Sequence, residues 1–377
     1  MDIILQNTVL LVLAAVVTIS IIKQVLLFFG ILKAYTTSAP EKKSSDITLI
    51  MAVKNEEAII EENVKKWLKV LPESGDMVVA DDQSWDGTPK ILEKIEAENS
   101  ALHVIYLRED KVRLSGKKFA LTLAIKGAKQ EAMLLTDADC YPKDENCLPL
   151  FAEQFAKGNS MVLGHSPITG DAGFAGWLQK MEGLNGAISY TGFSSLGVYY
   201  MGVGRAIGYS KNIFLKLGGF KALYKLPYGD DDLFVQKFAK HFKKTLLLNP
   251  KAFVETKAIE GIVAYWNQKR RHLSAGRKYK FAHKLLLMIA PLTDLGSLAL
   301  SLYFLICFGF ENELTKIALL FFGVKTVLEL LFNTILSSKL AYGAKGIPLV
   351  VWQYISPIFN AFVVFSLWLK PVKIWTK

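Results

Sequence analysis

The sequence is poor in cysteine, and its charges are unequal in sign. Its 377 residues include only three cysteines, and their spacing matches neither a zinc site nor a disulfide framework. This excludes a disulfide-stapled secreted domain and indicates a reducing compartment. Acidic residues number 34 against 45 basic ones, which gives a net charge of +11. Apolar residues make up 51 % of the chain, and this excludes a disordered protein.

The pattern of a cleaved signal peptide is also missing at the start of the sequence. Residues 5–22 are almost all apolar and residues 25–32 extend the run, which is long enough to cross a bilayer. No positive charge precedes the run, and no small-residue cleavage site follows a short apolar core. We therefore expect residues 1–33 to form a retained transmembrane anchor.

Long apolar runs return after residue 284. Residues 285–310, 317–336 and 347–369 are three further candidate spans. The last one contains Gln353, Pro357 and Asn360, so a bent, re-entrant or interfacial segment is an alternative to a simple span. We expect residues 285–377 to form a membrane region of two or three spans.

Basic residues indicate the orientation of these spans. Residues 268–284 hold seven Lys or Arg and no acid, within a basic juxtamembrane segment at 266–284. Positive loops stay in the cytoplasm, so the region between the first and second spans is predicted to be cytoplasmic in a multi-pass protein of the cell membrane. Lys370, Lys373 and Lys377 do not fit a C-terminus on the outside. Topology and anionic lipid thus account for the basic charge, and no nucleic-acid partner is predicted.

The middle of the chain alternates short apolar runs with helical periodicity. Strands are expected at 47–53, 77–80, 104–107 and 132–135, and helices between them at 59–70, 89–97 and 119–130. Such alternation predicts an α/β domain with a mainly parallel sheet, here over residues 45–265. In such sheets ligands bind beyond the carboxyl ends of the strands.

Acidic residues gather at two of these strand ends. Asp137 and Asp139 are separated by one residue after a buried run, and together they can approach one hard divalent cation such as Mg²⁺ or Mn²⁺ and a substrate diphosphate. An acidic surface turn or a helix cap is the alternative. Asp81 and Asp82 can accept hydrogen bonds from a base N–H or a ribose hydroxyl.

Two further motifs lie nearer the membrane. Asp230, Asp231 and Asp232 are adjacent, so their repulsion should raise one pKa toward that of a general base, although an acidic helix start explains them equally well. The segment 266–272 (WNQKRRH) offers Arg side chains to a phosphate, or it is a positive flank of the membrane.

In this order the motifs resemble those of family-2 glycosyltransferases with a GT-A fold. The likeness is to membrane-bound members that include ceramide glucosyltransferase-like enzymes and polysaccharide synthases. It rests on five segments of this sequence, on one helix start and on an acceptor-side stretch that ends in G-G-F. The segments are ITLIMAVKNEE, VVADDQSWDGT, TDADC, GDDD and QKRRH, the helix start is Gly116-Lys117, and the stretch runs from Gly204-Arg205-Ala206 to Gly218-Gly219-Phe220.

The resemblance implies roles for individual residues toward a nucleotide-sugar donor. Glu56 and either Asp81 or Asp82 would hold the uridine or ribose, and Asp137 and Asp139 would hold the metal and the diphosphate. The other implied donor contacts are Lys117, Gln268, Arg271 and His272.

The resemblance also implies a catalytic base within the aspartate cluster. One alignment makes Asp232 the base, and we prefer it. An alignment shifted by one residue makes Asp231 the base.

The predicted function is therefore inverting transfer of a sugar, from a UDP-sugar by preference, to a lipid or lipid-linked acceptor at the cytoplasmic membrane face. A processive polysaccharide synthase is one alternative, but His272 stands where such enzymes carry Trp. A non-catalytic, nucleotide-sugar-binding membrane protein is the other.

Overall fold

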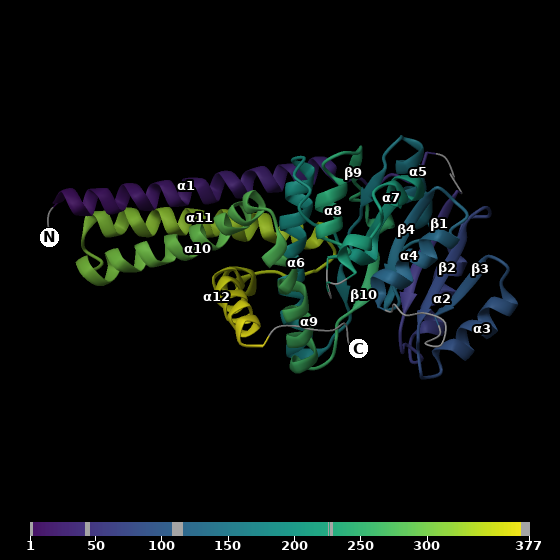
Figure 1. The fold of residues 1–377 in the computed structure, drawn as a ribbon. Helices are drawn as coiled ribbons and strands as arrows, with labels where there is room; N and C mark the ends of the chain where they lie inside the picture. Colours follow the sequence, from purple (N-terminus) through teal and green to yellow (C-terminus); the bar gives the residue numbers. More distant parts are fainter. Residues whose placement is uncertain (1–2, 42–45, 108–115, 225, 227–228, 371–377) are drawn as a thin grey trace.

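The computed structural model describes residues 3–41, 46–107, 116–224, 226 and 229–370. A long helical arm projects from one side of an α/β domain, and the N-terminus lies at the far end of the arm (Figure 1). The strands are β1 Ile47–Val53, β2 Asp76–Asp82, β3 Leu102–Leu107, β4 Ala132–Asp137, β5 Cys140–Pro142, β6 Met161–Leu163, β7 Ile168–Thr169, β8 Ile207–Ser210, β9 Lys244–Leu246 and β10 Val254–Lys257.

The α-helices fall into two groups by position in the chain. The helices of the α/β domain are α2 Ile60–Lys69, α3 Thr88–Glu98, α4 Lys117–Gly127, α5 Cys147–Ala156, α6 Gly173–Ser195, α7 Lys211–Lys216, α8 Leu233–Phe238 and α9 Ile262–Ala275. The helices of the two chain ends are α1 Ile3–Ala34, α10 Phe281–Phe308, α11 Glu313–Lys339 and α12 Ile347–Leu369.

The main sheet is mixed and mostly parallel, as the alternation of strands and helices predicts. Its seven strands run in the order β3-β2-β1-β4-β8-β6-β9, and only β8 is antiparallel to its neighbours. A second sheet has the order β5-β10-β7. The strand order reverses direction beside β1, where β2 lies on one side and β4 on the other, and ligands bind at such points.

Both faces of the main sheet are covered, which explains why its strands are continuous apolar runs. Alternate residues of β1 point to opposite faces: Leu49 and Met51 join a core with α2 and α5, whereas Ile50 packs with α4 and α8. The observed β2 and β4 are longer than expected. They extend to Asp82 and Asp137, so these acids are the last residues of their strands.

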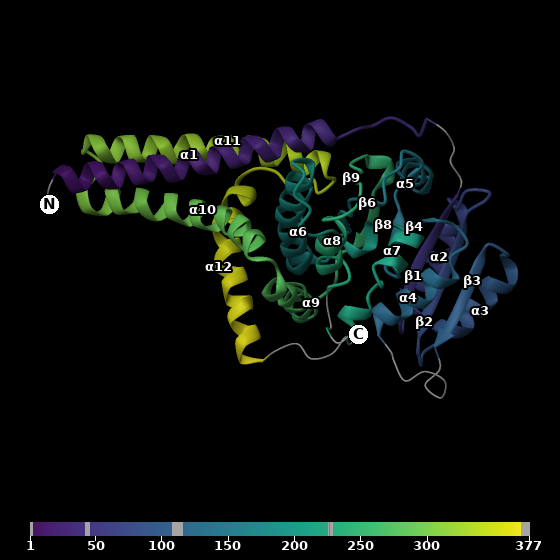
Figure 2. The same ribbon diagram turned by 45° about the horizontal axis from the view of Figure 1, so that its top comes forward.

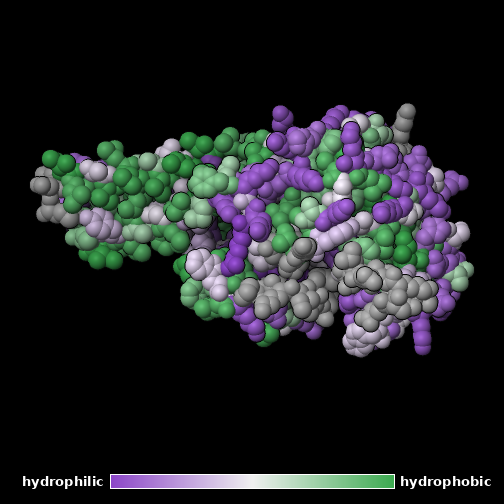
Figure 3. All heavy atoms as spheres, viewed as in Figure 1, coloured by the Kyte–Doolittle hydropathy of each residue, from purple (hydrophilic) through white to green (hydrophobic). Residues whose placement is uncertain are grey.

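The arm consists of α1, α10 and α11 lying side by side (Figures 1 and 2). With α12, these are four helices long and apolar enough to cross a membrane by length and composition. In both views α12 runs across the axis of the other three, at the end of the arm that meets the domain. Apolar surface covers the arm, and mostly polar surface covers the domain (Figure 3).

The arm is joined closely to the domain. The backbone of Tyr35, just after α1, pairs with Leu248, and the buried His165 ring contacts the Leu340 carbonyl oxygen at 3.0 Å. Because that oxygen only accepts, Nε2 of His165 carries the proton and Nδ1 accepts from the Tyr190 hydroxyl at 2.8 Å. These contacts fix the α/β domain at one end of the helical arm.

Candidate active site

Strand register brings the predicted acids to one edge of the sheet. In the parallel pairing, Val53 of β1 lies opposite Asp81 of β2, and Ala52 lies opposite Asp137 of β4. Carboxyl ends of parallel strands meet at the same edge, so three elements contribute side chains to a single site there.

Two interlocked turns follow β1 and β2 at this edge. The Asn55 backbone N–H donates to Ser84 Oγ at 2.9 Å, and Asn55 Oδ1 accepts from the Trp85 N–H at 3.0 Å. The Glu56 N–H donates to Thr88 Oγ1 at 2.8 Å. Glu56, the predicted contact of the nucleotide-sugar donor, is therefore held in place by the turn that the sequence DQSWDGT forms.

The backbone at these turns is strained. Asn55 has φ 54° and Gln83 has φ 59°, a region that costs free energy for residues other than glycine. Such strain persists only where the surrounding contacts hold it, and it gathers at functional sites. Gln83 directly follows β2, which bears Asp81 and Asp82, and Asn55 directly precedes Glu56.

Asp81 and Asp82 are both buried but have different partners. Asp82 accepts the Gly116 N–H with both oxygens, at 2.9 and 3.0 Å, and lies 3.8 Å from Lys54 Nζ. Asp81 accepts from the Ser84 hydroxyl, and burial raises its pKa. Asp82 thus holds the start of α4, whereas Ser84 holds Asp81.

Lys117 connects the two acidic motifs across the site. Its ammonium group lies 2.8 Å from Asp137 Oδ1 and 3.2 Å from Asp230 Oδ2. Burial opposes the charge on both partners, but Lys117 lowers the pKa of Asp230 and the two carboxylates raise the pKa of Lys117. The lysine after Gly116 therefore stabilises negative charge on β4 and at the start of α8 together.

Asp139 sits deeper, beside a cation that sequence reasoning did not assign. Burial and the neighbouring Asp137 raise the pKa of Asp139, whereas the Arg205 guanidinium opposes this shift. Arg205 Nε donates to Ser166 Oγ at 2.6 Å, which fixes the side chain. The segment Gly204-Arg205-Ala206 belongs to the motifs that suggested the family, so the signal was present although the role of the arginine was not predicted.

The residues present can hold a divalent cation only with help from a ligand. Within the described part of the chain, no group of three or more His, Cys, Asp or Glu side chains could hold a metal. Asp137 and Asp139 offer hard oxygen donors of the kind that Mg²⁺ and Mn²⁺ prefer. Two carboxylates completed by a diphosphate fit this chemistry, since such ions are commonly bound through one or two carboxylates plus substrate phosphates.

The three adjacent aspartates occupy different environments. Asp232 caps α8, accepting from the Leu233 N–H at 2.6 Å with one oxygen and from the Tyr279 hydroxyl at 2.9 Å with the other. Burial and the charges of its two neighbours raise the pKa of Asp231 to about 8. Burial also raises the pKa of Asp232. Two of the three carboxyl groups thus have raised pKa values, and Asp232 is at the same time the acidic start of α8.

The basic motif near the membrane lies on α9. Gln268, Arg271 and His272 are three and four residues apart, so they share one face of this helix. The His272 side chain is exposed on this helix. Partial desolvation lowers its pKa, and the positive charges of Arg271, Arg205, Lys269 and Lys117 add to this effect.

Gln268 and Arg271 are half-buried on that face. Neither side chain has a hydrogen bond or an ion pair with another described residue. Tyr279, four residues after the end of α9, donates to Asp232, so this end of α9 lies near the aspartate cluster. Among the described residues, Gln268 and Arg271 are thus available to a ligand.

The mixed, mostly parallel sheet with acids at its carboxyl edge, joined to helices long and apolar enough to cross a membrane, has the arrangement of a GT-A fold with a membrane region. The family model described as Glycosyl transferase family 2 matches residues 48–218 of the sequence. Residues 48–218 therefore form a family-2 glycosyltransferase domain, and the chain is a glycosyltransferase.

A similar solved structure supports the fold. The mannosyltransferase PcManGT from Pyrobaculum calidifontis, solved with GDP-Man and Mn²⁺, matches with a TM-score of 0.54 and 17 % identity, over 94 % of this chain and 99 % of that one. GalNAc-T7, solved with UDP, GalNAc and Mn²⁺, matches with a TM-score of 0.44 and 13 % identity, over 60 % of this chain and 48 % of that one. No curated protein sequence matches at a significant level.

Proposed function

We propose that this glycosyltransferase moves a sugar from a nucleotide-sugar donor to a hydroxyl group of a lipid or lipid-linked acceptor at the cytoplasmic face of the cell membrane. The observation that carries the proposal is the Lys117 bridge between Asp137 and Asp230. It joins the acids suited to a metal diphosphate to the cluster suited to a base, at the carboxyl edge of the main sheet.

The donor site is assigned as follows. Glu56 and Asp81 hold the ribose or base, with a uridine nucleotide preferred, while Asp82 keeps the start of α4 in place. Asp137 and Asp139 hold Mg²⁺ or Mn²⁺ with the diphosphate, and the bound ion would neutralise charge that develops on the leaving group. Further positive or donating groups toward the diphosphate come from Lys117, Arg205, Gln268, Arg271 and His272.

Asp231 is the better candidate for the base. Both oxygens of Asp232 already accept hydrogen bonds, from Leu233 and from Tyr279, so Asp232 serves to cap α8 and hold the juxtamembrane segment. Asp231 has a pKa raised to about 8 and lies between the capping Asp232 and the Lys117-paired Asp230. It would take the proton of the acceptor hydroxyl as the oxygen attacks the anomeric carbon opposite the diphosphate, a step that proton transfer accelerates by about 10²–10⁴.

The orientation of the arm supports a cytoplasmic site. With the basic segment 268–284 inside, α1, α10 and α11 cross the membrane and the domain lies at their cytoplasmic end. Because α12 lies across this bundle, it fits an interfacial helix better than a fourth span. The C-terminus then stays inside, which suits Lys370 and also Lys373 and Lys377, although the last two lie outside the described residues.

Turnover assays with the purified protein in detergent test the proposal. UDP- and GDP-sugars are screened with Mn²⁺ or Mg²⁺ and a lipid extract, and GDP-mannose is included because the PcManGT complex contains it. We expect metal-dependent release of one nucleoside diphosphate, its loss in Asp139→Ala, and transfer reduced by about 10²–10⁴ in Asp231→Asn with donor affinity retained.

Two results would contradict these assignments. Donor binding without any turnover, even with lipid extract, would favour a nucleotide-sugar-binding protein over an enzyme of this specificity. Normal transfer in Asp231→Asn together with an inactive but folded Asp232→Asn would move the base by one residue.

A further inference from the structure

Glu182, in the middle of α6, joins two other helices through one carboxylate. Its Oε1 accepts from Trp352 Nε1 at 3.0 Å and from the Ser356 hydroxyl, both on α12. Its Oε2 accepts from the Lys269 ammonium group of α9 and from Asn360 Nδ2 of α12 at 3.3 Å. The side chain of Glu182 is only 7 % exposed, so four donors satisfy a nearly buried charge.

Lys269 places this contact inside the basic motif of α9. It directly follows Gln268 and precedes Arg271 by two residues, so an ion pair at Lys269 fixes the rotation of the helix that carries them. Phe359 of α12 stacks on Tyr265 of α9, with ring centroids 6.4 Å apart. The position of α9 therefore depends on α6 and α12, which both lie outside the acidic edge of the sheet.

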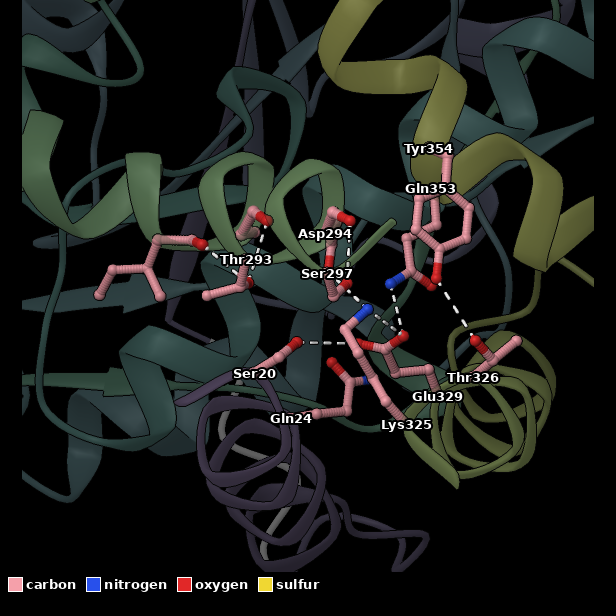
Figure 4. A network of polar contacts seen from close by, with 12 residues as sticks. Ser20, Gln24, Thr293, Asp294, Ser297, Lys325, Thr326, Glu329, Gln353 and Tyr354 are labelled. Atoms are coloured by element: carbon pink, nitrogen blue, oxygen red, sulfur yellow. Dashed lines mark hydrogen bonds and ion pairs between the residues drawn. The ribbon is translucent and has the colours of Figure 1, made fainter. Parts of the chain in front are cut away.

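A second carboxylate, Glu329 of α11, holds the inner side of α12 against the arm (Figure 4). Gln353 Nε2 donates to Glu329 Oε2 at 2.6 Å, and Glu329 also accepts from Ser20 of α1 at 3.0 Å and from Lys325 at 2.8 Å. Lys325 in turn lies 3.0 Å from Asp294 of α10. One network thus connects the three helices of the arm to α12.

These contacts connect the arm to α9, the helix that carries Gln268, Arg271 and His272. The path runs from Glu329 of α11 through Gln353 of α12, then from α12 to Glu182 and on to Lys269 of α9. Each step is a hydrogen bond or ion pair to a carboxylate that is almost wholly buried. Breaking one such contact leaves a buried charge without its partner, so the carboxylates favour one arrangement of α12 and α9 strongly.

We propose that Glu182 is a positioning residue that makes diphosphate binding by the α9 face depend on the seating of α12 against the arm. The inference rests on the proposed function, because it takes Gln268, Arg271 and His272 as contacts of the donor diphosphate. It goes beyond that function in naming the residue and the helix through which the membrane region acts on the site. Glu182 itself touches neither donor nor acceptor.

The test compares the affinity for UDP with that for UMP, measured by calorimetry on the full chain in detergent with Mn²⁺. The two ligands share base, ribose and α-phosphate, so their ratio isolates the β-phosphate that the α9 face would contact. In Glu182→Gln the neutral amide no longer pairs with Lys269, and we expect the UDP/UMP affinity ratio to fall by about tenfold while UMP binding stays within twofold. GDP and GMP replace them if the donor screen identifies a guanosine nucleotide.

The matched control is Glu153→Gln on α5. Glu153 is also a nearly buried helix carboxylate with a lysine partner, Lys157 at 2.5 Å, but it lies away from α9 and α12. The control should leave the ratio unchanged. Ser356→Ala provides a milder change, since it removes one donor without changing charge, and the ratio should fall by about two- to threefold. It keeps the test informative if Glu182→Gln does not fold.

The outcomes separate the inference from the proposed function. If the unaltered protein binds neither UDP nor GDP, the proposed function fails. If it prefers the diphosphate but the ratio is unchanged in both Ser356→Ala and Glu182→Gln, the positioning role is wrong. Equal weakening of UDP and UMP would also overturn the role, because general loss of structure affects both ligands alike.

Discussion

The three aspartates at the start of α8 show how neighbours in sequence acquire different chemistry. Asp230 is paired with Lys117, Asp232 is held by Leu233 and Tyr279, and Asp231 between them has a pKa raised to about 8. The sequence identified the cluster, but it left open whether Asp231 or Asp232 is the base. Hydrogen-bond partners contributed by the distant residues 117 and 279 distinguish the three carboxyl groups.

The raised pKa of Asp231 predicts the pH dependence of transfer. A base must be ionised to accept a proton, so kcat/KM should rise with pH and level off above about pH 8. The midpoint of this acid limb reports the coupled cluster in the free enzyme. The limb of kcat should lie lower, because the bound metal favours the ionised carboxylate. Initial rates between pH 5 and 9.5 at saturating and limiting donor concentrations measure both limbs.

The residual transfer of Asp231→Asn is the control for this profile. It should lack the acid limb, since the titrating group has been removed. A limb that persists at the same pH in this variant would assign the titration to another residue.

At the scale of elements, α1 and α6 pack closely because glycines line their contact. A Cβ at Gly192 of α6 would lie 2.8 Å from Leu27 Cδ2 of α1, and a Cβ at Gly30 of α1 would collide with Ser195. The absence of side chains at these positions lets the membrane anchor lie directly against the helix that carries Glu182. Both residues are regular helical glycines, so space explains them and backbone conformation does not.

Alanine substitutions on α6 should therefore have opposite effects on stability. Gly192→Ala should lower the free energy of unfolding by about 1–3 kcal/mol, the usual cost of overpacking. Gly186→Ala on the same helix meets nothing within 4 Å and should raise it by up to about 1 kcal/mol through helix propensity. Thermal unfolding in detergent compares the two variants. Equal shifts in Tm would show that Leu27 moves aside with no loss of stability.

At the scale of the whole molecule, the direction of α12 bears on whether this helix spans the membrane and on which side the C-terminus lies. The apolar run 347–369 is long enough to span a membrane, yet the helix lies across the axis of α1, α10 and α11 (Figure 2). Glu182 and Glu329 contact polar groups on its inner side. Its outer side exposes apolar residues at helical spacing, namely Ile347, Val351, Ile355, Ile358, Phe362, Phe365 and Leu369. This pattern suits a helix lying at the membrane surface.

Reporter fusions should place the C-terminus on the same side as the catalytic domain. A green fluorescent protein joined after Lys377 should fluoresce, and alkaline phosphatase joined there should be inactive, because both report a cytoplasmic end. Fusions in the loop after Asn312, between α10 and α11, should give the opposite pair of results. An active phosphatase after Lys377 would instead make α12 a true span.

Local sequence by itself determined most of the elements. Apolar run length predicted the membrane helices, and alternation of strands and helices predicted a mainly parallel sheet, because both depend on burial patterns repeated within a few residues. The acids at strand ends were found for the same reason, since a parallel sheet brings carboxyl ends to one edge. Family membership followed from the order of these motifs.

Contacts between distant segments were decided only by the tertiary structure. Lys117 meets Asp230 across more than one hundred residues, Arg205 comes to lie beside Asp139, and Glu182 gathers donors from α9 and α12. No periodicity records such pairs, because a side chain's partner depends on how whole helices pack. The direction of α12 has the same origin: its apolarity allows a span, and the buried carboxylates on its polar side hold it across the bundle instead.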